Sequence, residues 1–143
     1  MSCIGVIPYT RHFIETGNPM KIIRIVNMNR PEAEPIRAGY AVSFWSRLRG
    51  LTFRGDLPLG EGLLLVESKD SRMDTSIHML MVFMDLGVVW INNDCQVVDT
   101  VLAKSWRPAY FPKQPARYVL EINPQRLKDY TIGDRVQFDE DSV

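Results

Sequence analysis

Short apolar segments separated by turn residues recur along almost the whole chain, and this pattern constrains the fold most. Residues 21–27 are rich in β-branched side chains, and residues 118–122 alternate between the two faces of a strand. Gly, Pro, Asn and Asp punctuate the chain at intervals of roughly ten residues, a spacing typical of sandwiches and barrels. We therefore predict a mainly β fold (β-rich α+β): a compact barrel-like or sandwich sheet of about seven or eight strands with two short helices.

The two helices are expected where an N-cap precedes a helical pattern. Ser43 can cap residues 44–49, whose apolar side chains follow helical spacing. Asn123 can cap a second helix, because Pro124 then falls at the first helical position, where proline is best tolerated.

Three connecting segments have turn or loop chemistry. Residues 68–74 are predicted to form a polar loop. Residues 92–94 (Asn-Asn-Asp) are predicted to form a hairpin turn, because Asn and Asp tolerate positive φ. Residues 105–115 hold three prolines and three aromatic residues, which predicts a structured loop rather than a strand.

The chain length of 143 residues indicates one domain, which we place at residues 20–143. Residues 1–19 lack a clear period and are predicted to be a loose extension, or to precede a natural translation start at Met20. Cys3 and Cys95 are too few for a disulfide framework, and no signal peptide or membrane span is recognisable. These features predict a cytoplasmic protein with two reduced thiols.

The net charge limits the classes of partner. The 17 basic and 17 acidic residues cancel, whereas nucleic-acid binders usually carry a basic excess that neutralises phosphates. We therefore expect no nucleic acid as main partner. No Cys/His spacing approaches a zinc ligand set, and no P-loop or dinucleotide turn is present, so no metal or cofactor is predicted.

Several stretches taken together resemble the domain-of-unknown-function 192 family. They are Arg47-Leu48-Arg49-Gly50-Leu51 with Arg54, Gly60-Glu61-Gly62-Leu63-Leu64-Leu65, Ile77-His78-Met79, Val88-Val89-Trp90-Ile91, Pro115-Ala116-Arg117-Tyr118-Val119-Leu120-Glu121 and Ile132-Gly133-Asp134. The resemblance covers most of residues 22–138 and implies a compact β-rich fold without an established activity.

The chain departs from the family pattern at two places. An acidic residue is usual at the position of Gly87, for which Asp85 is a candidate substitute on the same strand face. A small, glycine-containing run is often found where this chain has Asn123-Pro124-Gln125.

Three groups of residues are candidates for a site. His78 titrates in the range that suits acid–base chemistry, although its apolar neighbours are also typical of a hydrogen-bonded core histidine. Arg47 and Arg54 could bind an anion, or could form ordinary surface ion pairs. Trp106 and Tyr110 lie on the proline-rich loop, where they could form a recognition surface or could plug one end of the core.

Two functions of different classes follow. The favoured one is a non-enzymatic domain that binds a small ligand or a protein, because no catalytic set is visible. Its surface would combine residues 105–115, which we call the aromatic loop, with the basic helix end at Arg47 and Arg54. The alternative is a small hydrolase-like enzyme in which His78 works with Asp85 or Asp74 around an anion held by Arg47 or Arg54. An accessory protein without a ligand is a third, plainer hypothesis.

Overall fold

The computed structural model describes residue 3 and residues 21–41, 57–77, 84–105, 107 and 109–140. These residues form seven strands and one short 3-10 helix, η1 (Pro124–Asp129). The strands are β1 (Ile22–Asn27), β2 (Ile36–Ala41), β3 (Glu61–Ser71), β4 (Leu86–Ile91), β5 (Val97–Ala103), β6 (Ala116–Ile122) and β7 (Val136–Glu140). The predicted mainly β class is confirmed.

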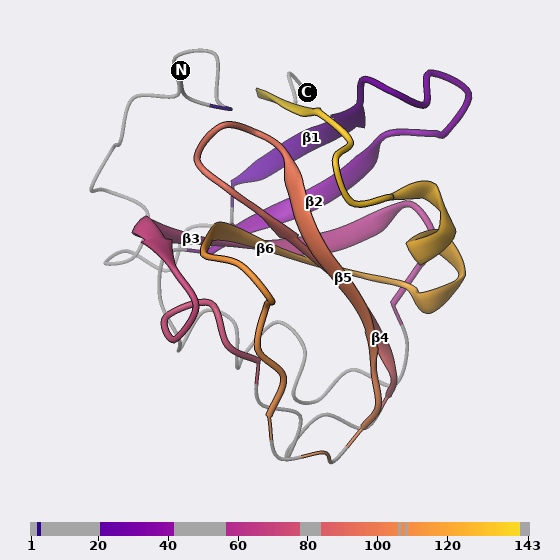
Figure 1. The fold of residues 1–143 in the computed structure, drawn as a ribbon. Coiled ribbons are helices and arrows are strands. Elements are labelled where there is room, and N and C mark those ends of the chain that lie inside the picture. The colour runs from indigo at the N-terminus through magenta and orange to yellow at the C-terminus, as the bar shows by residue number, and fades with distance from the viewer. Residues whose placement is uncertain are drawn as a thin grey trace.

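All seven strands belong to one sheet in the order β5-β4-β6-β3-β2-β1-β7, and only the β2–β3 pair is parallel. The β4–β5 hairpin runs across the front of β1, β2 and β3, so the sheet is strongly bent (Figure 1). Its two edge strands approach at one end, where the Val97 amide donates to the Asp134 carbonyl at 2.9 Å. Over the described strands, the sheet is barrel-like in curvature but does not close into a complete barrel.

Each face of the sheet buries its own apolar cluster, as the alternation of side chains predicts. The inner cluster joins both halves of the bent sheet and includes Ile25, Val89, Leu120 and Phe138. The outer cluster is built mainly on β3, β4 and β6, and Trp90 is its largest fully buried member. Because β4 contributes to both clusters, all six of its residues are buried.

The second predicted helix is confirmed as η1. The Asn123 side chain accepts a hydrogen bond from the Gln125 amide at 2.9 Å, and Pro124 opens the helix. The first predicted helix, at residues 44–49, lies outside the described residues. In the described part of the chain, no helix has the length and apolarity needed to cross a bilayer.

The predicted loop at residues 68–74 is wrong over its first half, because β3 continues to Ser71. Ser71 pairs with Ala116 after a shift of register that follows Val66. The outward-facing polar side chains of this strand end are exposed, so their composition resembles that of a loop. Pairing with β6 overrides the weak β-propensity of these residues.

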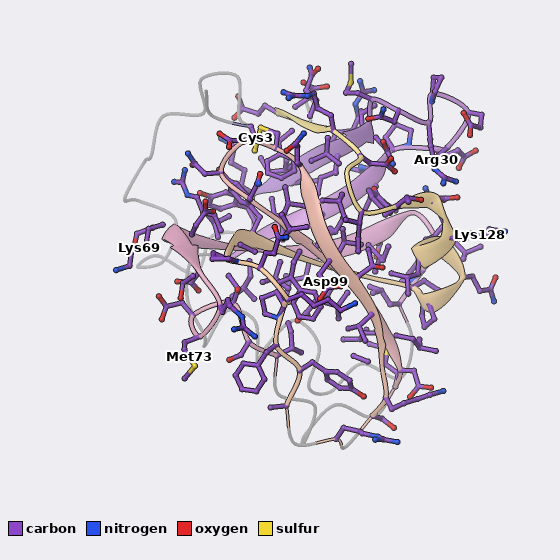
Figure 2. All side chains as sticks on the ribbon, in the orientation of Figure 1. Cys3, Arg30, Lys69, Met73, Asp99 and Lys128 are labelled. Carbon is purple, nitrogen blue, oxygen red and sulfur yellow. A yellow bond between two sulfur atoms is a disulfide. The ribbon has the colours of Figure 1, made fainter. Side chains whose placement is uncertain are left out.

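The predicted pair of reduced thiols is also wrong, because Cys3 and Cys95 form a disulfide that spans 92 residues of sequence. Both residues are buried in the inner cluster. The Cys3 carbonyl accepts a hydrogen bond from the Phe138 amide at 3.1 Å, so residue 3 lies along β7 (Figure 2). The remainder of the predicted N-terminal extension, residues 4–19, lies outside the described residues.

Candidate recognition site

The residues predicted to form a site are only partly described. Arg47, Arg54, His78 and Trp106 lie outside the described residues. Asp85 and Tyr110 are described, and both contact the beginning of the aromatic loop.

Asp85 precedes β4 and holds the start of the loop. Its Oδ1 accepts the Ser105 amide at 2.9 Å, and its Oδ2 lies 3.3 Å from Lys104 Nζ. The Ser105 amide, with a smaller contribution from the Lys104 ammonium, lowers the pKa of the Asp85 carboxyl below its usual value. A carboxylate with a lowered pKa that already holds two donors is suited to anchoring backbone rather than to exchanging protons near neutral pH.

Tyr110 anchors the middle of the loop. Its amide and carbonyl exchange hydrogen bonds with Ile77 at 2.8 and 2.9 Å, and its hydroxyl accepts the Lys104 amide at 2.9 Å. The ring is half-buried against the outer cluster. Of the two alternatives for this aromatic residue, the contacts favour the one in which it packs against the core.

Two further contacts fix the far end of the loop. The buried Asp99 of β5 accepts the Lys113 amide at 2.9 Å through Oδ2. Arg72 Nε donates to the Pro112 carbonyl at 3.0 Å. Neither Asp99 nor Arg72 was predicted as a site residue. The signal for Asp99 is its place within the apolar run of β5, because a buried carboxylate there is expected to accept a hydrogen bond from a nearby donor.

The segment after β3 is held by a hydrogen bond from Trp90 of β4. The indole Nε1 donates to the Thr75 carbonyl at 2.7 Å, and the Thr75 hydroxyl donates to the Ser71 carbonyl at 2.6 Å. Both Trp90 and Thr75 are fully buried. Residues 71–77 are therefore fixed to the sheet and, through Ile77 and Arg72, to the aromatic loop.

Apolar side chains are nevertheless exposed on these two connected segments. Met73 is 73% exposed and Phe111 is 48% exposed. The sequence between Asp99 and Glu121 contains four basic residues and no acidic one. We call Met73, Phe111 and the described residues 104–105, 107 and 109–113 the loop surface: it is an anchored, basic surface that displays apolar groups.

Glu121 is the most deeply buried carboxylate of the described chain. It lies in the middle of the sheet on β6, opposite Leu63 on one side and Val88 on the other, with no exposed surface. A carboxylate at such a position needs compensating interactions, and Glu121 has at least one interaction partner. The strand alternation around Tyr118 and Leu120 places its side chain on the outer face, but residue type alone did not predict its complete burial.

Gly87 has a packing reason to lack a side chain. A Cβ at this position would lie 3.2 Å from Ile122 Cγ1 and 3.3 Å from Leu127 Cβ. The acidic residue that the resemblance implies here would require the Ile122 side chain and Leu127 of η1 to shift slightly. Asp85, the candidate substitute, directs its carboxylate to the Ser105 amide and the Lys104 ammonium.

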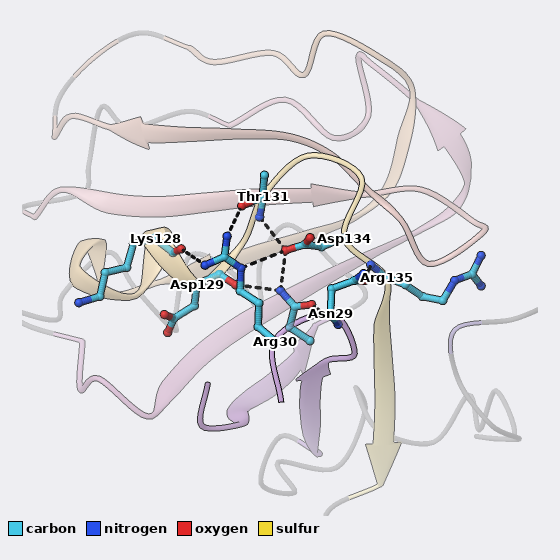
Figure 3. A network of polar contacts seen from close by, with 8 residues as sticks. Asn29, Arg30, Lys128, Asp129, Thr131, Asp134 and Arg135 are labelled. Carbon is cyan, nitrogen blue, oxygen red and sulfur yellow. Dashed lines mark hydrogen bonds and ion pairs between the residues drawn. The ribbon is translucent and has the colours of Figure 1, made fainter. Parts of the chain in front are cut away.

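A separate polar network fastens the turn before β7 to the β1–β2 connection (Figure 3). Asn27 Nδ2 donates to Asp134 Oδ2 and to the Asp129 carbonyl, both at 2.8 Å. Arg30 donates to Thr131 Oγ1 at 2.7 Å. The donors and acceptors of this network satisfy one another, so its role is structural.

The arrangement of strands, anchored loop and polar turn can be compared with known proteins. The family model DUF192, described as "Uncharacterized ACR", matches residues 25–138. The chain belongs to the DUF192 family. The match covers every described strand except the first residues of β1 and the end of β7.

Relatives of this DUF192 chain occur in archaea. A UPF0127 protein of Thermococcus gammatolerans is 35% identical over 101 residues, which cover 69% of this chain and 64% of that protein. A UPF0127 protein of Pyrococcus furiosus is 29% identical over 117 residues, covering 80% and 97%. The chain thus spans just under two thirds of the length of the Thermococcus relative.

Two solved structures share the fold. A protein of Sinorhizobium meliloti, described as a proposed transcription regulator, superposes with a TM-score of 0.72 at 20% identity, over 87% of this chain and 97% of that one. A protein of unknown function from Novosphingobium aromaticivorans gives a TM-score of 0.69 at 17% identity, over 96% of both chains. At these identities the similarity shows that the DUF192 fold is shared.

Proposed function

We propose that this protein is a non-enzymatic binding domain and that the loop surface is its recognition site. The observation that carries the proposal is the combination of firm anchoring and exposed apolar groups. Asp85, Tyr110, Asp99 and Arg72 fix the loop at four points, and Phe111 is still displayed to solvent.

Anchoring matters because a partner does not have to order this loop when it binds. Immobilising a flexible side chain costs about 0.5–1.5 kcal/mol each on association, and fixing backbone costs more. Large exposed apolar side chains on a fixed loop are typical of recognition surfaces. The basic residues Arg107 and Lys113 favour a small ligand or protein segment that offers negative charge beside an apolar group, whereas Lys104 is paired with Asp85.

The test is an amide chemical-shift titration of the full chain with phenylacetate and with a short peptide in which aspartates flank a phenylalanine. We expect shifts at residues 72–77 and 109–113, and we expect Phe111→Ala and Met73→Ala to weaken them about tenfold or more. Ile132→Ala is the matched control, because Ile132 is 56% exposed on the turn before β7. Shifts confined to other surfaces, or full binding by Phe111→Ala, would remove the basis of the proposal.

The hydrolase-like alternative gains no support from the described residues. Of its proposed members, Asp85 and Asp74 alone are described, and Asp85 is engaged by the loop. Among the described residues, no three His, Cys, Asp or Glu side chains gather as a metal site would require. Binding therefore remains our conclusion, and the expectation that nucleic acid is not the main partner remains a prediction.

The cytoplasmic location expected from the sequence is also a prediction still to be tested. The Cys3–Cys95 disulfide weighs against a strongly reducing compartment, because most cytosolic thiols are kept reduced, although hyperthermophile proteins are an exception. Acid quenching of cells followed by thiol labelling would decide the matter. Fully labelled cysteines would favour a reducing cytoplasm, and unlabelled ones an oxidising environment.

A further inference from the structure

The disulfide holds residue 3 on the edge of β7 that faces away from β1. The Val136 amide donates to the Cys95 carbonyl at 2.9 Å, and the Phe138 amide donates to the Cys3 carbonyl at 3.1 Å. Alternate amides of a strand point to the same edge, so these two donors are successive positions along it. Cys3 thus continues a ladder that Cys95 begins, and the two residues have Cα atoms 5.1 Å apart.

The hydrogen bond between the Val136 amide and the Cys95 carbonyl does not depend on the disulfide. In the hairpin turn, the Asn92 carbonyl accepts the Cys95 amide at 3.1 Å, and the Asn92 amide donates to the Gln96 carbonyl at 2.9 Å. Asn93 is held from outside the turn, by Asp70 through its amide and by Arg117 through its side chain. The turn is therefore formed whether or not its sulfur is bonded.

Cys95 also occupies an unusual backbone position. Its φ of 67° lies in the left-handed region, and it is the only described residue other than glycine with a positive φ. A three-residue hairpin loop places its last residue in this conformation, and glycine is the residue that adopts it without a steric penalty. A cysteine here has a steric cost that glycine would not have, and the hydrogen bonds of the turn and the disulfide offset this cost.

The Cys3 half has one described backbone contact, the hydrogen bond from Phe138. Cys3 also lies at the end of the molecule opposite Met73, well separated from the loop surface (Figure 2). Loss of the sulfur–sulfur bond would leave residue 3 held by this hydrogen bond, by weak contacts of its Sγ with the Asn92 and Asn93 carbonyls at 3.7 and 3.9 Å, and by its burial in the inner cluster. Cys95 is therefore held in place by the hairpin turn, whereas the attachment of Cys3 to β7 depends on the disulfide.

We propose that Cys3 and Cys95 form a redox-controlled clasp that covers the second edge of β7. In the oxidised protein the disulfide keeps residue 3 on this edge. A dithiol reductant opens the clasp: one thiolate attacks a sulfur of the pair and breaks the bond, and the second thiolate then closes the disulfide of the reductant. Two electrons and two protons end on the thiols of Cys3 and Cys95, and the Phe138 amide becomes open to solvent or to another extended segment.

The test measures amide hydrogen exchange and thiol labelling of the full chain in two redox states. After oxidised glutathione we expect no cysteine labelled by iodoacetamide, and after dithiothreitol without denaturant we expect both labelled. Exchange at Phe138 should rise about tenfold or more on reduction, whereas Val136 should change little because the Cys95 carbonyl stays in place. Reoxidation should restore the slow exchange.

Two variants serve as controls. Cys3→Ser should show fast exchange at Phe138 in both redox states, and Cys95→Gly should do the same while relieving the left-handed backbone. Three results would overturn the clasp: two free thiols after oxidised glutathione, a disulfide that dithiothreitol reduces only in denaturant, or slow exchange at Phe138 in the reduced protein. Because wild-type protein is used in both states, the conclusion does not depend on how well the variants fold.

Discussion

Gly60, in the turn before β3, and Gly62, the second residue of β3, should respond in opposite ways to the same substitution. An alanine Cβ at Gly62 would lie 2.7 Å from the Glu121 carbonyl oxygen and 3.1 Å from methyl groups of Ile36 and Ile122. The carbonyl belongs to the β3–β6 ladder and cannot rotate away, so the strands must separate locally. At Gly60, an added Cβ would meet nothing within 4 Å.

The comparison isolates strain in the folded state. Replacing glycine by alanine restricts the unfolded chain and stabilises by about 0.4–1 kcal/mol at a compatible site, and this contribution is the same for both variants. Inserting a methyl group into packed surroundings costs about 1–3 kcal/mol. We therefore expect Gly62→Ala to be less stable than Gly60→Ala by about 1–3 kcal/mol, or about 3–9 °C in Tm for a domain of this size.

The assay is urea unfolding of both variants and the wild type, followed by tryptophan fluorescence and by circular dichroism. Equal free energies of unfolding within about 0.5 kcal/mol would refute the reasoning, since surface substitutions typically fall in that range. So would a Gly62→Ala variant more stable than the wild type. A lower stability of Gly62→Ala would also show that β3 needs a glycine at its second position for its close approach to β6.

Three further outcomes are expected. The folded-state pKa of Asp85 lies below its unfolded value near 3.9, so the stabilisation that Asp85 provides is complete above about pH 3.9 and is lost as the pH falls through the folded-state pKa. Hydrogen exchange at the Ser105 amide of the wild type should therefore accelerate in this acidic range. Asp85→Asn should show a flatter pH profile. Trp90→Phe should lower the free energy of unfolding by about 1–3 kcal/mol in urea titrations, because the buried Thr75 carbonyl loses its donor, and an unchanged midpoint would contradict this. Reduction of the disulfide, which spans 92 residues, should lower stability by up to about 4.6 kcal/mol on the chain-entropy model; superimposable urea curves with and without dithiothreitol would show that the disulfide does not constrain the unfolded chain.

Strand positions could be predicted because they depend on local alternation. The segments around Ile25, Val89 and Leu120 carry their burial pattern in the sequence, and all three lie in strands. The end of β3 could not be recognised at Ser71, because its strand conformation comes from a partner far along the chain. The parallel pairing of β2 with β3 is likewise a property of the whole sheet.

The contacts of the site were harder to predict, because side-chain type does not reveal which backbone group needs an acceptor. Asp85 and Tyr110 were identified as candidates, yet their roles as anchors depend on Ser105, Lys104 and Ile77. The hairpin turn illustrates the same limit. It was predicted because Asn and Asp tolerate positive φ, and the turn is present, but the left-handed residue is Cys95. The loop length decides which position adopts that conformation.

The pairing of β1 with β7 has a consequence for synthesis on the ribosome. β1 leaves the ribosome well before its neighbour β7, which is the last of the described strands. At about 5–20 residues per second, the roughly 110 residues between them take on the order of 5–20 s to translate. Throughout that interval the nascent sheet has an open flank, which makes chaperone binding or misassociation on the ribosome an expected competitor of folding.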